Sequence, residues 1–514
     1  MLAASLAAAL TLQLAGAPAA QADSGDVSPA SKTATATPIK HFVTLMQENH
    51  SFDNYFGTYP GADGLPEGTC MPVHPKKRGS RCIEPFRVGG RPVVDLGHNI
   101  GVYNRQYRDG KMDGFISALT SQRGASDLAM GYYDDKDLPY YWNVADNYVL
   151  FDRAFTSAAG GSVWNHFFWA TATPGNPKDD AILEKGFDHV TTIFDRLQAA
   201  GIDWKFYIQN YDPNVTFRNP GNGDRASQIV WAPVLNYNRF LDNPELSSRI
   251  VPLEQYYTDL KNNELPAVSY VVPAGASEHP PGSIQAGSRF VRTLLNSLMA
   301  SSAWDSSAFM WTYDDWGGWY DHVKPPKVDK FGYGFRAPCL LVSAYARKGQ
   351  VDHTTIDFTS QLKFIENNWN LKPLASRDAA ANDITTAFDF EAGPREPVLL
   401  SEMRNSPAAK PPAARTVYAL YGGALLVPPV LLAFGSISQR RRRRRLTASS
   451  ALGAAPGACD LPLSPSCRSS LFSSGPIPRR PSRPVRRSRS EPCPLWLAFP
   501  SHWTAKPSRP TTPA

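Results

Sequence analysis

Four side chains that carry oxygen ligand atoms come in two adjacent pairs, and each pair follows a short apolar run. They are Glu48, Asn49, Asp314 and Asp315. The first pair follows the run at residues 42–46, and the second follows the run at residues 309–313. Such runs are typical of buried strands, and ligands bind at the carboxyl ends of strands in open α/β sheets. Because adjacent buried carboxylates repel each other unless a cation lies between them, the two pairs predict a metal site.

A surface turn is the alternative interpretation of the second pair. The stretch around it contains Trp311, Trp316 and Trp319, and surface turns seldom carry this many aromatic residues. Gly317 and Gly318 follow directly and allow the backbone to turn sharply beside the acids. The sequence therefore favours the metal site.

Ser162 ends a turn of small residues, 158–162, just before an apolar helical stretch. A serine in this position suits a nucleophile at a helix N-terminus, where backbone N–H groups favour an anionic oxygen. An ordinary serine N-cap fits the same pattern. The turn alone leaves both interpretations open.

Two loops supply histidines that could transfer protons or contact an anion. His98 and Asn99 lie in the loop Asp-Leu-Gly-His-Asn, and His279 lies beyond the predicted strand 267–272. A single histidine is more often structural than catalytic. Two of them in a chain with paired acids favour a catalytic role.

The elements that must position these residues alternate between strand and helix patterns. Five runs predict strands, at residues 42–46, 204–208, 267–272, 309–313 and 339–343. Helical periodicity lies between them at residues 192–199, 289–300 and 360–369. The alternation predicts an α/β fold with a largely parallel, buried sheet.

The charge of the 514-residue chain is unevenly distributed. From Arg440 to the end there are fifteen basic and two acidic residues, so this segment is +13 and the remainder is −6 within the total of +7. A mildly acidic folded part argues against nucleic-acid binding by that part.

The two ends of the chain predict export and a membrane anchor. Residues 1–22 resemble a signal peptide with cleavage after Ala22, and residues 23–37 resemble a linker before a catalytic domain at 38–397. After a Pro/Ala linker at 398–415, residues 416–437 are uncharged, apolar and long enough to span a bilayer. The basic tail 438–514 would be disordered and cytoplasmic, with the catalytic domain outside. A sorting signal that is later removed is the alternative for 416–437.

The six cysteines contain no Cys-x-x-Cys pair, so a cysteine zinc site is not predicted. Cys70 and Cys82 lie in one Gly/Pro/Lys-rich loop and could form a disulfide in an oxidising compartment. Cys339 lies in a predicted strand, where a free buried thiol is expected.

Four motifs, in this order between roughly Lys40 and Phe390, resemble the bacterial phosphoesterase family, which joins phosphatidylcholine-type phospholipases C and a secreted acid phosphatase. The motifs are Glu48-Asn49-His50-Ser51-Phe52-Asp53-Asn54-Tyr55-Phe56-Gly57, Gly161-Ser162 with Asn165, Glu278-His279-Pro280-Pro281, and Tyr313-Asp314-Asp315 with Gly317-Gly318, Asp321-His322-Val323 and Pro325-Pro326.

The resemblance implies an alkaline-phosphatase-like three-layer α/β/α sandwich with a mostly parallel central sheet. It also implies one divalent metal ion. The implied metal ligands are Glu48, Asn49, Ser162, Asp314 and Asp315, with Ser162 also the nucleophile. The phosphoryl oxygens would contact His98, Asn99 and His279, and one of the two histidines would protonate the leaving group.

The expected activity is hydrolysis of phosphoric esters through a phosphoserine, of acid-phosphatase or phospholipase C type. The turn Gly160-Gly161-Ser162 is closer to the phosphatase branch, because phospholipases of this family tend to have Gly-Pro-Thr there. A phospholipase C acting on phosphatidylcholine-type lipids is the alternative. An inactive, surface-anchored binding protein is a further alternative, disfavoured because every catalytic residue type is present.

The sequence does not determine the identity of the metal or the role of three tryptophans near the expected site. The implied ligands are all oxygens, which suits a hard cation such as Ca²⁺, Mg²⁺ or Mn²⁺, although the superfold also uses zinc and iron. Trp164, Trp316 and Trp319 could hold a choline head group by cation–π contact or could pack in the core.

Overall fold

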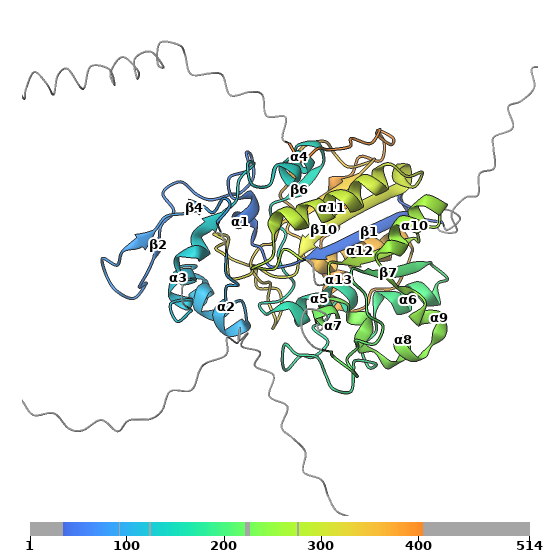
Figure 1. The fold of residues 1–514 in the computed structure, drawn as a ribbon, viewed down its shortest axis with the longest axis horizontal. Coiled ribbons are helices and arrows are strands. Elements are labelled where there is room, and N and C mark those ends of the chain that lie inside the picture. The colour runs from blue at the N-terminus through green and yellow to red at the C-terminus, as the bar shows by residue number, and fades with distance from the viewer. Residues whose placement is uncertain (1–33, 92, 123–124, 222–226, 275–276, 404–514) are drawn as a thin grey trace, which may run out of the picture. The chain divides into compact units, whose positions relative to one another are not determined.

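The computed structural model describes residues 34–403 apart from residues 92, 123–124, 222–226 and 275–276. Its centre is an eight-stranded sheet (Figure 1). In spatial order the strands are β12 (Gln350–Asp352), β6 (Val149–Phe151), β11 (Cys339–Ser343), β10 (Ser307–Tyr313), β1 (His41–Gln47), β9 (Val268–Val272), β7 (Trp204–Ile208) and β8 (Ile250–Pro252).

The sheet is parallel except at one strand. The pairs of β1 with β9 and β10, of β7 with β8 and β9, and of β6 with β12 are parallel. β11 is antiparallel to both of its neighbours, β10 and β6. The predicted α/β class with a largely parallel sheet is confirmed.

One face of the sheet is covered by α5 (Ser162–Thr171), α6 (Ile193–Ala199) and α12 (Phe358–Asn368). Trp169 of α5 donates a 3.1 Å hydrogen bond to the Thr44 hydroxyl of β1. The rings of Phe364 on α12 and Phe42 on β1 lie 5.2 Å apart. These contacts use the β1 side chains that alternate toward this face.

The opposite face is covered by α4 (Pro139–Asn147), α10 (Glu254–Asn262) and α11 (Ile284–Met299). Tyr141 of α4 lies 5.6 Å from the ring of Trp311 on β10, and Tyr256 of α10 lies 5.5 Å from the ring of Tyr207 on β7. The sheet therefore lies between two helical layers. In Figure 1, α11 of the second layer lies over the sheet beside β10.

Seven further α-helices belong to the described part of the chain. They are α1 (Phe52–Phe56), α2 (Ile100–Tyr107), α3 (Phe115–Ala118), α7 (Gln228–Trp231), α8 (Asn238–Asp242), α9 (Pro244–Ser247) and α13 (Ser376–Ala380). Two small two-stranded sheets pair β2 (Met71–Pro72) with β3 (Cys82–Ile83) and β4 (Phe86–Arg87) with β5 (Gly131–Tyr132). A disulfide joins Cys70 to Cys82 beside the first pair, and Cys339 is buried and free.

All five predicted strands and three predicted helices are present, with ends that differ by a few residues. The helix expected at 289–300 begins earlier, at Ile284, because Ser283 caps it by accepting a hydrogen bond from Ala286 N–H. The sheet strands that the sequence missed are three residues long, too short to show a period.

The predicted signal peptide, membrane span and basic tail lie outside the described residues. Within the described part of the chain, none of the helices combines the length and the apolar character that a membrane crossing requires.

Candidate active site

The two pairs of predicted ligands meet because their strands are neighbours. β1 and β10 are parallel, and their last residues, Gln47 and Tyr313, are paired in register. Asp314 continues this pairing by donating its N–H to the Gln47 carbonyl at 3.0 Å. Glu48, Asn49, Asp314 and Asp315 consequently emerge side by side at one sheet edge, and all four are buried.

The Asn49 amide lies between these carboxylates and the two predicted histidines. Its nitrogen lies 3.1 Å from His98 Nε2, and its oxygen position lies 2.8 Å from Asp314 Oδ1 and 3.1 Å from Glu48 Oε2. In each histidine Nδ1 faces a backbone carbonyl, at 2.6 Å for His98 and 2.7 Å for His279. The protons therefore lie on Nδ1, and Nε2 accepts from the Asn49 amino group.

In this orientation the Asn49 oxygen faces two carboxylate oxygens. The reverse orientation would donate to both carboxylates, but it would require a proton on Nε2 of both His98 and His279. Two further acceptors, Glu48 Oε1 and Asp314 Oδ2, are buried without a hydrogen-bond partner among the described residues. Buried polar atoms are almost always satisfied in folded proteins. The converging oxygens therefore fit a cation, and the residues present could hold one.

Burial raises the pKa of Glu48 well above its ordinary value, and the charges of Asp314 and Asp315 raise it further. The pKa of Asp314 is also raised, by burial first and then by the charge of Asp315. Burial likewise raises the pKa of Asp315. Without a cation, the site is a cluster of mutually repelling carboxyl groups.

These shifts predict how pH affects the metal-free protein. A carboxyl group whose pKa is raised on folding keeps its proton when the unfolded chain has lost it, so folding loses stability as pH rises above the ordinary values of 4.5 for Glu48 and 3.8 for Asp314. We expect the free energy of unfolding of the chelated protein to fall between pH 5 and pH 8. Urea titrations with and without added metal measure this. A stabilisation by metal that fails to grow with pH in this range would contradict the prediction.

Ser162 is the first residue of α5, and its hydroxyl donates to Asp315 Oδ2 at 3.5 Å. The N-cap position belongs to Gly161, so the alternative of an ordinary serine N-cap is wrong. Asp180 supplies the capping oxygens instead, accepting from the N–H groups of Gly161 at 2.6 Å and Trp164 at 2.7 Å. Sequence reasoning missed Asp180 because it lies eighteen residues beyond Ser162 and shows no motif.

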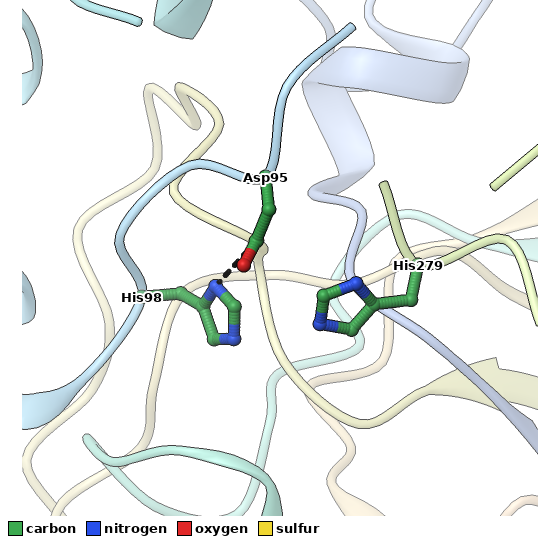
Figure 2. Close-up of side chains that lie close together, drawn as sticks. All are labelled: Asp95, His98 and His279. Carbon is green, nitrogen blue, oxygen red and sulfur yellow. Dashed lines mark ion pairs between the residues drawn. The ribbon is translucent and has the colours of Figure 1, made fainter. Parts of the chain in front are cut away.

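Figure 2 shows His98 and His279 facing each other beside Asp95. The ring centroids lie 5.5 Å apart, and Asp95 Oδ1 lies 3.4 Å from His98 Nδ1. Burial and the nearby His98 charge lower the pKa of His279. Asp95 was not predicted, although its place three residues before His98 is a signal that could have found it.

Asn99 lies next to His98, but its side chain caps a helix, whereas the His98 side chain contacts the Asn49 amide. Its side-chain oxygen accepts a 3.0 Å hydrogen bond from Val102 N–H and caps α2. The side chain is exposed. Its role in contacting a phosphoryl group stays a prediction.

Glu278, just before His279, is buried and accepts hydrogen bonds from the hydroxyls of Tyr55, Tyr141 and Tyr313. Burial raises its pKa to about 7. The three tyrosines come from α1, α4 and β10, so this carboxyl group connects the His279 loop to three separate elements, of which β10 leads into Asp314.

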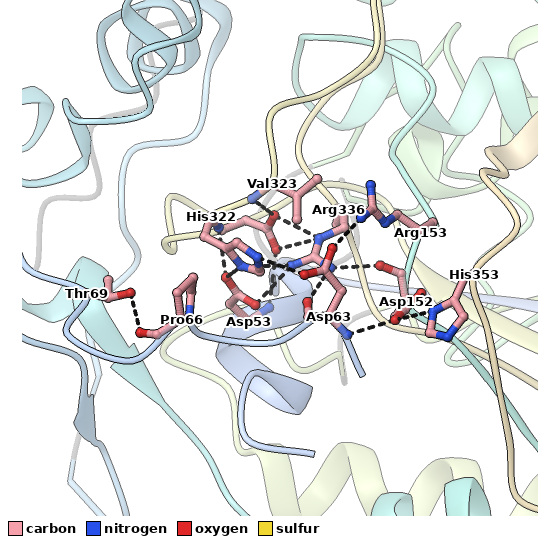
Figure 3. A network of polar contacts seen from close by, with 11 residues as sticks. Asp53, Asp63, Pro66, Thr69, Asp152, Arg153, His322, Val323, Arg336 and His353 are labelled. Atoms are coloured by element: carbon pink, nitrogen blue, oxygen red, sulfur yellow. Dashed lines mark hydrogen bonds and ion pairs between the residues drawn. The ribbon is translucent and has the colours of Figure 1, made fainter. Parts of the chain in front are cut away.

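The motif residues Asp53, Asp321 and His322 form a separate cluster around Arg336, and Figure 3 shows Asp53, His322 and Arg336 together. The fully buried guanidinium donates to Asp53 Oδ1 at 3.0 Å and Asp321 Oδ1 at 2.9 Å. His322 Nδ1 lies 2.7 Å from Asp53 Oδ2. Because Arg336 already balances these carboxylates, we assign the cluster to stability and not to metal binding.

Removing the charge at the centre of this cluster should destabilise the fold. We expect Arg336→Met to lower the free energy of unfolding by about 3–5 kcal/mol, because it removes the buried cation that pairs with Asp321 and leaves Asp53 with His322 alone. Chemical denaturation measures the loss. As a matched control, Arg347→Met removes an exposed arginine that pairs with Asp389 at 3.5 Å and should cost at most about 1 kcal/mol. Equal losses in the two variants would contradict the assignment.

The three tryptophans near the motifs are core residues. Trp316 and Trp319 are 0% exposed and Trp164 is 8% exposed. Trp316 donates its indole N–H to Gln106 at 2.7 Å, and Trp319 stacks on His50. The structure therefore supports core packing and not an open aromatic box.

Residues 39–372 match the model of the Phosphoesterase family, and the chain belongs to that family. The family match places the chain among hydrolases of ester bonds.

Curated relatives include several phospholipases C. The chain is 30% identical over 422 residues to "Phospholipase C B" of Mycobacterium tuberculosis, covering 70% of this chain and 79% of the relative. It is 29% identical over 421 residues to "Non-specific phospholipase C1" of Arabidopsis thaliana, covering 72% of this chain and 75% of the relative.

A solved protein of the alkaline phosphatase superfamily from Vibrio parahaemolyticus is also similar, with 11% identity, a TM-score of 0.32 and coverage of 66% of this chain and 68% of the other. A likeness of this size carries no conclusion about activity or substrate.

Proposed function

We propose that this chain is a metal-dependent phosphodiesterase of phospholipase C type, cleaving the bond between phosphorus and the glycerol oxygen of a phospholipid. The observation that carries the proposal is the placement of the Ser162 hydroxyl 3.5 Å from Asp315 Oδ2, beside Glu48 Oε1 and Asp314 Oδ2, which are buried without a hydrogen-bond partner among the described residues. The similarity to proteins named phospholipase C supports the lipid substrate.

The residues have the following roles in this proposal. Glu48, Asn49, Asp314, Asp315 and Ser162 hold one divalent cation. The cation lowers the pKa of the serine hydroxyl and neutralises phosphoryl charge when bound. The Asn49 amino group keeps His98 and His279 directed at the same place.

Ser162 attacks phosphorus in line, and the bond from phosphorus to the glycerol oxygen breaks, so the phosphorylated head group is left on the serine as a diester. Water then hydrolyses the serine–phosphorus bond, which releases the head-group phosphate and restores the hydroxyl. A histidine protonates the departing alkoxide. His98 and His279 are the two candidates for this donor, and either one must first take up a second proton on Nε2, which ends the hydrogen bond that Nε2 accepts from Asn49.

Parallel assays on p-nitrophenylphosphorylcholine and p-nitrophenyl phosphate test the proposal. We expect the diester to be hydrolysed at the higher kcat/KM with metal present, and chelation to stop turnover. A preference for the monoester would favour the acid phosphatase, which the Gly160-Gly161-Ser162 turn supports as second candidate. Metal binding without hydrolysis of either ester would favour the inactive binding protein.

We further propose that the catalytic domain is exported and works outside the cell, attached by residues 416–437. The Cys70–Cys82 disulfide supports this, because such bonds persist in oxidising compartments. Protease treatment of intact cells should release the catalytic domain. A domain that is protected until the cells are lysed would contradict the proposal.

A further inference from the structure

His166 lies one helical turn after Ser162 on α5, and its side chain is 0% exposed. Its Nδ1 lies 2.9 Å from the Ser162 carbonyl oxygen. Because a carbonyl only accepts, the imidazole proton lies on Nδ1 and the lone pair is on Nε2. That lone pair has no hydrogen-bond partner among the described residues.

The Nε2 atom faces the far side of the carboxylate site. It lies 3.5 Å from Glu48 Oε1, the oxygen that does not face Asn49. Asp314 also directs one oxygen toward Asn49, and its other oxygen, Oδ2, lies 4.0 Å from the His166 ring nitrogen Nδ1. Glu48, His166 and Asp314 each offer a ligand atom, and these atoms lie within 4.8 Å of one another.

A hydrogen bond does not explain this arrangement. With its proton on Nδ1, His166 offers no donor to Glu48, and 3.5 Å is longer than an ordinary N–H···O bond. Two ligands that share one ion through bonds of about 2.0–2.2 Å lie roughly 3.0–3.5 Å apart. The separation therefore fits two ligands of one cation.

We propose that His166 Nε2 is a nitrogen ligand of the metal centre, beside Glu48 and Asp314. This inference rests on the metal site of the proposed function and extends it. It replaces the expected all-oxygen ligand set by a mixed set of oxygen and nitrogen. Imidazole ligands favour zinc and iron over magnesium and calcium, so the centre should prefer the former.

Pulsed EPR of the full-length chain loaded with Mn²⁺ tests the ligand without measuring activity. We expect a nitrogen coupling to the Mn²⁺ signal that changes when histidine is labelled with ¹⁵N. The coupling should disappear in His166→Gln and stay in the matched variant His189→Gln, which replaces an exposed histidine stacked on Phe187. Mn²⁺ bound without histidine coupling, or a coupling that survives in His166→Gln, would overturn the proposal.

A second variant covers the case in which His166→Gln does not fold. A histidine coupling that remains after both His98 and His279 are replaced by glutamine supports His166, and its loss there overturns the proposal. In competition with Mg²⁺, the preference for Zn²⁺ should fall at least about tenfold in His166→Gln, as the loss of even an outer-shell partner does.

The EPR measurement and the esterase assay distinguish an error in the His166 assignment from an error in the proposed function. A metal-loaded, active enzyme without nitrogen coupling contradicts the ligand assignment alone. A protein with the coupling but without esterase activity contradicts the function alone.

Discussion

Ser162→Ala should lower turnover of p-nitrophenylphosphorylcholine by about 10⁴-fold or more, because no other group can form the covalent intermediate. The fold should be retained. Gly161 occupies the N-cap position, Asp180 accepts the capping hydrogen bonds, and the serine hydroxyl makes only a long contact to Asp315. Five of the six proposed ligands remain, so the metal should still bind.

The control for this variant is Ser376→Ala, which removes a serine from the same first position of another helix, α13. It should leave kcat and metal content unchanged. Steady-state kinetics, elemental analysis and thermal unfolding measure the three properties. Substantial ester hydrolysis by folded, metal-loaded Ser162→Ala would disprove the nucleophile assignment.

Asp314→Asn should weaken metal binding more than about 100-fold and abolish turnover with it, since a ligand contributes at least as much as the outer-shell partners whose loss costs 10- to 100-fold. The variant keeps the shape of the side chain and removes one of three buried carboxylates. Since burial and the neighbouring Asp315 charge raise the pKa of Asp314, the metal-free variant should unfold at a higher temperature than the metal-free parent at pH 7.

Added metal should raise the thermal stability of the parent protein relative to that of Asp314→Asn. The parent should gain thermal stability with increasing metal concentration, and Asp314→Asn should gain little, because stabilisation by a ligand follows its affinity for the folded state. Asp357→Asn is the matched control. It replaces another buried aspartate, at the N-cap of α12, by a residue that caps equally well, and it should keep its metal. Unchanged metal content in Asp314→Asn, by elemental analysis, would refute its role as ligand.

The sequence by itself determined the fold class and the local position of the ligands. Apolar runs at 42–46 and 309–313 are visible because a buried strand needs consecutive apolar residues. The acids after each run were accordingly recognisable as strand-end residues. Ordered motifs then predicted the family that the match over residues 39–372 shows.

Only the tertiary structure decided which residues face one another. The register of β1 with β10 brings Glu48 next to Asp314 across more than 260 residues of sequence, and no local pattern encodes that pairing. The same is true of Asp180 at the start of α5 and of His166 facing Glu48.

The motif residues themselves divided between two sites once the chain was folded. Asp53 and Asp321 have the same residue type as the proposed metal ligands and lie in the same motifs, but Arg336 balances their charge. A buried carboxylate can pair with either of two kinds of cation, a guanidinium group or a metal ion. Which cation it meets depends on the neighbours that packing brings to it, and the sequence around Asp314 and Asp321 does not contain that information.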